Sequence, residues 1–180
     1  MLPVVIGALD FQQYEGLTRV DMGLFARLFG RHFRAEVENC IHIAATAIAV
    51  RLFKKYAHKY PERDFETVSA LAGAVTNELF GAPPSNETAR QFLAANKEWV
   101  EVTLHELVEE PEICAIVSLL THTRANIAGN TGTVTPEMVL SWRRLHDAGI
   151  LLPIEKIQIP HSPEDLMRQV RGFELWTMKN

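Results

Sequence analysis

The stretch Arg31–Tyr60, RHFRAEVENCIHIAATAIAVRLFKKYAHKY, decides the fold of this chain. Its middle is apolar on every helical face except at His42 and Thr46. A helix that is apolar all round is a buried helix, so other segments must surround it. The uncharged run Asn39–Val50 has 12 residues, whereas a membrane span needs about 20. We therefore predict a central core helix over about 31–60, with its middle hidden from water.

The rest of the chain carries clear helix start and stop signals. Asp64, Ser85 or Asn86, Thr135 and Ser162 are typical N-caps, and glycines or prolines follow most of the apolar runs. We expect further helices over residues 65–80, 87–110, 111–127, 136–148 and 163–176, a first helix from Thr18 or Asp21 to Phe29, a loop at 128–135 and an N-terminal arm at 1–17. This pattern predicts an all-α, single-domain bundle of six to seven helices over residues 1–180, with at most one short extended segment near 150–160.

Charge and cysteine content narrow the class of protein. The formal net charge is −4, and residues 61–135 hold 4 Lys and Arg against 11 Asp and Glu. The linear sequence has no basic patch, which argues against nucleic acid as the main partner. Cys40 and Cys114 each lie in an apolar run, where a free thiol behaves as a small buried hydrophobe. The opening segment Leu2–Leu9 lacks a basic leader, so we expect no signal peptide and a cytoplasmic protein.

The central helix supplies a candidate ligand site. Glu38 and His42 are four residues apart and share a helical face, on which Ala45, Ala49 and Tyr56 also lie. We expect His42 to point into the protein and to pair with Glu38, beside a cavity that the two alanines leave open. Two interpretations stay open: a paired core histidine, or the polar end of a pocket for a small apolar ligand.

A short motif suggests a second function. The run Leu145–Gly149, LHDAG, resembles the Leu-His-Asp-x-Gly motif of HD-type metal-dependent phosphohydrolases, which are also all-helical. The resemblance implies a metal site in which an upstream histidine and a downstream aspartate join His146 and Asp147. In this sequence His122 and Asp165 are the residues that fill those two places. On its own helix, however, His122 lies opposite the apolar stripe, so we expect it to be partly exposed.

The same region suggests a third function. A helix that ends in LHDAGILLPIEKIQIP resembles the helix and wing of winged-helix DNA-binding proteins. Residues 136–180 hold 6 basic and 6 acidic residues, so this region lacks the positive charge that phosphate binding requires.

No motif of nucleophilic catalysis or phosphate binding accompanies these candidates. The chain has no Gly-x-Ser-x-Gly, no Cys-x-x-Cys and no Gly-rich phosphate loop. Our leading prediction is a non-catalytic helical binding or regulatory protein, homodimeric and without a cofactor, that binds a protein partner or a small apolar ligand.

Overall fold

The computed structural model describes residues 33–158, 160 and 162–180. Over these residues the chain forms seven α-helices, two short 3-10 helices and no strand, so the predicted all-α bundle is confirmed. The α-helices are α4 (Phe33–Lys59), α5 (Phe65–Leu79), α6 (Glu87–Ala95), α7 (Lys97–Glu106), α8 (Pro111–Thr131), α9 (Pro136–Asp147) and α10 (Pro163–Lys179), and the 3-10 helices are η1 (Leu107–Glu109) and η2 (Ile154–Lys156). The predicted arm at 1–17 and the helix ending at Phe29 lie outside the described residues. None of the helices in the described part is long and apolar enough to cross a membrane.

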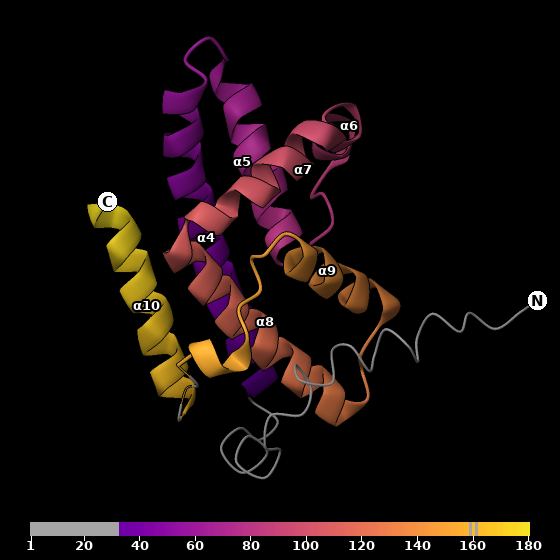
Figure 1. Cartoon of the computed structure of the whole chain (residues 1–180), viewed down its shortest axis with the longest axis vertical. Coiled ribbons are helices and arrows are strands. Elements are labelled where there is room, and N and C mark those ends of the chain that lie inside the picture. Colours follow the sequence, from indigo (N-terminus) through magenta and orange to yellow (C-terminus); the bar gives the residue numbers. More distant parts are fainter. Residues whose placement is uncertain (1–32, 159, 161) are drawn as a thin grey trace, which may run out of the picture.

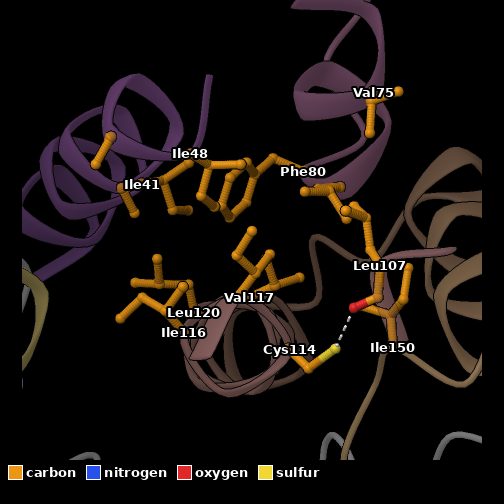
Figure 2. Packing of buried hydrophobic residues seen from close by; sticks show 14 of the residues in the cluster. Ile41, Ile48, Val75, Phe80, Leu107, Cys114, Ile116, Val117, Leu120 and Ile150 are labelled. Carbon is orange, nitrogen blue, oxygen red and sulfur yellow. Dashed lines mark hydrogen bonds between the residues drawn. The ribbon is translucent and has the colours of Figure 1, made fainter. Parts of the chain in front are cut away.

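Helix α4 lies in the middle of the bundle. It packs against α5 and α10 on either side and against α8 (Figure 1). Ile41 and Ile48 of α4 meet Val117 and Leu120 of α8 in the core, and all four side chains are almost fully buried (Figure 2). Helix α7 crosses α5, and α9 packs against α5 as well. The apolar rows predicted from the sequence therefore form one main core, and a small second cluster joins Val139 and Trp142 of α9 to Ala125 of α8.

The predicted helix ends are confirmed where a cap is visible in the sequence. The Asp64 carboxylate accepts a hydrogen bond of 2.7 Å from the backbone N–H of Thr67 at the start of α5. Ser162 accepts the equivalent bond from the N–H of Asp165 at the start of α10. Gly81 follows α5 with a φ of +62°, a left-handed conformation that favours glycine. These local signals set the boundaries independently of tertiary packing.

Some of the predicted boundaries are wrong. The single helix expected over 87–110 is broken at Asn96, whose backbone N–H and side-chain amide both donate to the Phe92 carbonyl at 2.9 Å and end α6. Helix α8 extends beyond its predicted end at Ile127 to Thr131, because Gly132 supplies the left-handed terminator at φ +64°. The segment near 150–160 contains the helical turn η2 and no strand among its described residues, which agrees with the prediction of at most one short extended segment there.

The expectation that α4 is buried on every side is also wrong. One side of the helix is open to solvent, and we call it the outer face of α4; its exposed residues are Ala35, Asn39, His42, Thr46, Val50 and Lys54. At 3.6 residues per turn this face lies opposite Ile41, Ile48 and Leu52, which point into the core. The three packed neighbours do not extend around to it. The Thr46 hydroxyl donates to the His42 carbonyl at 2.9 Å, so this polar group is satisfied without a tertiary partner.

Candidate functional site

The five residues proposed as a ligand site do not converge. His42 is exposed on the outer face of α4, so its predicted inward orientation is wrong. Glu38 pairs with Arg124 of α8 instead, through bonds of 3.1 Å from Nε and 2.8 Å from Nη2. A guanidinium offers a carboxylate two parallel hydrogen bonds, which an imidazole cannot match. Glu38 therefore ties α4 to α8, and His42 is left facing solvent.

The remaining members of that set are also dispersed. Tyr56 is 1% exposed, and its hydroxyl has no hydrogen-bond partner among the described residues. It lies 14 residues beyond His42, which is about 21 Å along the helix axis. Burial raises the pKa of the Tyr56 hydroxyl far above its usual range. Ala45 packs against the core, and Ala49 is half-buried. A role in ligand binding stays a prediction for these residues, and their arrangement does not favour it.

The four residues of the metal-site alternative are separated as well. His122 is buried, and its Nε2 donates to the Leu152 carbonyl at 2.8 Å, so the predicted partial exposure is wrong. His146 and Asp147 lie at the exposed end of α9, with 3.4 Å between the His146 Nδ1 and Asp147 Oδ1 atoms. Asp165 lies in the first turn of α10, where it accepts a hydrogen bond from Arg168. Over the described part of the chain no three His, Cys, Asp or Glu side chains are grouped so that they could hold a metal ion.

The fold also lacks the features of the DNA-binding alternative. Residues 150–158, which follow α9, form η2 and irregular backbone and no wing strand. Arg144 of α9 bonds to the carboxylates of Glu78 and Glu101, so its charge is engaged within the protein.

Both cysteines are buried, as predicted. Burial raises the pKa of Cys40 to about 11, with the nearby Glu36 carboxylate adding to the shift. Burial likewise raises the pKa of Cys114, whose thiol donates to the Leu107 carbonyl at 3.2 Å (Figure 2). Thiols with raised pKa values hold little thiolate at neutral pH and are poor nucleophiles.

A row of polar side chains lines the buried side of α8. The Ser118 hydroxyl donates to Ile150 O at 3.1 Å and accepts from Leu152 N at 2.8 Å. One turn further, burial lowers the pKa of His122, whose Nδ1 has no partner in the described structure. Another turn on, the side-chain amide of Asn126 is 1% exposed and also without a partner. Ser118 and His122 of this row fix the segment after α9 against α8.

A concave surface of about 530 Å³ lies between α5, the loop that follows it and α6, and we call it the α5–α6 groove. Its floor is one face of α5, with residues at i, i+1, i+4 and i+5 over about four turns. The middle of this floor consists of Ser69, Ala70, Gly73, Ala74 and Asn77. No atom lies within 4 Å of the place where a Cβ on Gly73 would stand, so the floor is open at that point.

Phe65 closes one end of the α5–α6 groove. Its side chain is 71% exposed, although its ring contacts Phe53 of α4 with centroids 5.0 Å apart. A large aromatic group on the rim of a concave surface supplies contact area to a ligand at low entropic cost.

Helix α6 forms the opposite wall and is loosely held. None of its residues is buried, and Ala89 and Leu93 face the α5–α6 groove. Its main anchor is Phe92, whose ring centroid lies 6.4 Å from that of Trp99 on α7. A helix with so little buried surface opens locally at low cost. The groove therefore combines a floor on the well-packed helix α5 with a wall that has no buried residue.

A second groove, of about 410 Å³, lies between α8, the η2 segment and α10. It too has a helical glycine on its wall, Gly172, with open space around it. Its aromatic groups are already engaged, because Phe173 is 8% exposed and Arg51 lies 4.2 Å from the ring centroid of Trp176. The α5–α6 groove is the better candidate, since Phe65 at its end is far more exposed than Phe173.

The sequence analysis did not single out the α5–α6 groove. The available signal was the run of small residues on one face of α5 together with the glycine in mid-helix. That face becomes concave only because α6 folds back beside it, which no local pattern indicates.

Comparison with protein-family models, with curated proteins and with solved structures gives no match for this chain.

Proposed function

We propose that this chain is a non-catalytic helical binding protein and that the α5–α6 groove docks an apolar segment of a partner protein. The observation that carries the proposal is a concave surface with a glycine in its floor and a largely exposed aromatic side chain at its end. Such a shape accepts a helix or extended segment through a few anchoring side chains.

Gly73 supports this function on energetic grounds. A glycine inside a helix costs about 1 kcal/mol of stability relative to alanine. The space around Gly73 is empty, so packing within the chain does not require glycine there. A side chain at this position would instead occupy the volume that a partner needs for close approach.

The proposal is tested by filling the α5–α6 groove. We expect peptides selected from a random library against the full chain to bind Gly73→Leu at least about tenfold more weakly, because the leucine side chain takes the place of a buried anchor. The measurement is fluorescence anisotropy with the selected peptides.

Gly172→Leu is the matched control. It replaces another helical glycine that has open space around it, and it projects toward the second groove. Both variants gain helix propensity, so neither is expected to unfold. Equal binding of the peptides to both variants would contradict the proposal. A wild-type dimer that Gly73→Leu makes monomeric would assign the groove to a second copy of the chain and not to another protein.

A further inference from the structure

We infer that the segment bound by the α5–α6 groove is an amphipathic helix that carries basic residues about three turns apart, beside its apolar stripe. This inference rests on the proposed function and adds the chemistry of the partner.

The charged side chains that line the α5–α6 groove are both acidic. They are Glu66 at the Phe65 end and Glu78 at the other end, and no Lys, Arg or His among the described residues lines it. Glu66 is exposed and makes no ion pair within the described part of the chain. Its charge is therefore available to a partner.

The Glu78 end also retains negative charge. Arg144 of α9 bonds to Glu78 and to Glu101 of α7, so two carboxylates share one guanidinium. The cluster of these three side chains has a net charge of −1 at neutral pH. Arg90 of α6 does not line the groove and is paired with Glu87 at 2.9 Å. Both ends of the groove thus attract cations and repel phosphate groups.

The spacing of the two acidic ends suits a helix. Glu66 and Glu78 are twelve residues apart on one helix, which corresponds to about 18 Å. A bound helix reaches both ends with basic residues about eleven or twelve positions apart, or three turns. Between them, the small residues around Gly73 allow the helix axes to approach closely. An anionic lipid or a nucleic acid does not match this charge pattern.

The inference is tested with synthetic helical peptides of about 16 residues, which share one Leu and Ala stripe and differ at two positions that flank it, about three turns apart. The two positions carry Lys, Gln or Glu. We expect the Lys peptide to bind the wild-type chain at least about tenfold more tightly than the Glu peptide at low salt, because attraction at two sites replaces repulsion. At about 0.5 M salt the ratio is expected to fall below about threefold, since exposed charges are screened.

Charge reversal in the protein provides the decisive variant. Glu66→Lys is expected to lower the preference for the Lys peptide by about threefold or more, because one attractive pair becomes repulsive. Glu112→Lys is the matched control, since Glu112 also lies in the first turn of a helix but borders the second groove. It is expected to leave the preference unchanged.

The outcomes separate this inference from the proposed function. If the Lys, Gln and Glu peptides bind equally well and Gly73→Leu weakens the binding of all three, the α5–α6 groove is a binding site, and the inference that its partner is basic is wrong. If Glu66→Lys and Glu112→Lys change the preference equally, the effect is one of net charge and the inference is also overturned. If none of the peptides binds, the proposed function and the inference both fail.

Discussion

Helices α4 and α8 lie against each other in the bundle, and they differ in where their polar side chains point. In α8, 13 of the 21 residues are buried, among them polar residues such as Ser118, His122 and Asn126. In α4, 9 of the 27 residues are buried, and most of its polar residues are exposed or, like Arg51, half-buried in an ion pair. The helix with the longest uncharged apolar run is thus the one with the open face.

The difference shows that apolar content alone does not determine burial. Exposure of Ala35 and of the Thr46 methyl group to solvent costs little free energy, because both expose little apolar area. A hydroxyl can be buried in α8 when it donates a hydrogen bond within the protein. The Thr123 hydroxyl, for example, donates to the Leu119 carbonyl at 2.7 Å. What decides the burial of each face is which neighbours pack against it.

The largest expected effect on stability comes from shortening an apolar side chain, and it is expected on α8 but not on the outer face of α4. Leu120→Ala on α8 is expected to lower the free energy of unfolding by about 3 kcal/mol, because it leaves a cavity in a fully buried site. Val50→Ala on the outer face of α4, where the side chain is 51% exposed, is expected to change it by less than about 0.5 kcal/mol. Urea denaturation of both variants measures the difference. Similar losses in the two variants would mean that the outer face of α4 is covered in solution.

Removing one hydroxyl from each helix compares their polar side chains in the same way. Ser118→Ala is expected to lower the free energy of unfolding by about 2 kcal/mol, because the Leu152 N–H and the Ile150 carbonyl lose their buried partner. Thr46→Ala removes only an exposed bond within α4 and is expected to cost less than about 0.5 kcal/mol. The same urea titrations apply. A neutral Ser118→Ala would show that the segment after α9 is not fixed by this hydroxyl.

The smallest expected effect is a dependence on pH from His122. Burial lowers the pKa of this imidazole, and its Nδ1 has no acceptor for the added proton. Below about pH 6.5 the unfolded chain takes up a proton that the folded chain does not, so stability falls as the pH falls. Above that pH both states are neutral, and the contribution is present in full. We expect a loss on the order of 1 kcal/mol between about pH 7 and pH 5.

His122→Gln tests this dependence, because the amide still donates a hydrogen bond but does not titrate in this range. The variant is expected to lose the decline in thermal stability between about pH 7 and pH 5. His42→Gln on the outer face of α4 is the control and is expected to keep it, since His42 is exposed. The carboxyl groups of Glu110 and Asp64 have lowered pKa values, so they titrate below about pH 5 and do not contribute to the change in thermal stability between about pH 7 and pH 5. A decline that persists in His122→Gln would assign the effect to another group.

Local sequence signals predicted much of the secondary structure. The caps at Asp64, Thr135 and Ser162 and the terminators at Gly81 and Gly149 are in the predicted places. Each depends on bonds between residues a few positions apart, so it is readable from the sequence. The break at Asn96 was missed, because asparagine is compatible with both a helix interior and a cap.

The candidate site was not predictable in the same way. The residues chosen from the sequence share a face of α4 but lie up to about 27 Å apart along its axis, from Glu38 to Tyr56. The α5–α6 groove combines residues of α5 with others that follow a loop and the first turns of another helix. Its shape depends on the angle at which α6 returns to α5, to which the packing of Phe92 on Trp99 contributes.

The sequence by itself determined that this protein is all-α, where most of its helices begin and end, and that both of its cysteines are buried. These features follow from hydrogen bonds and apolar spacing within one or two turns of chain. Only the tertiary structure decided which face of α4 meets solvent, that the polar row of α8 lies inside, and that a groove opens beside Gly73. Burial and concavity are properties of neighbouring elements, and a helix's own residues do not specify which neighbours it will have.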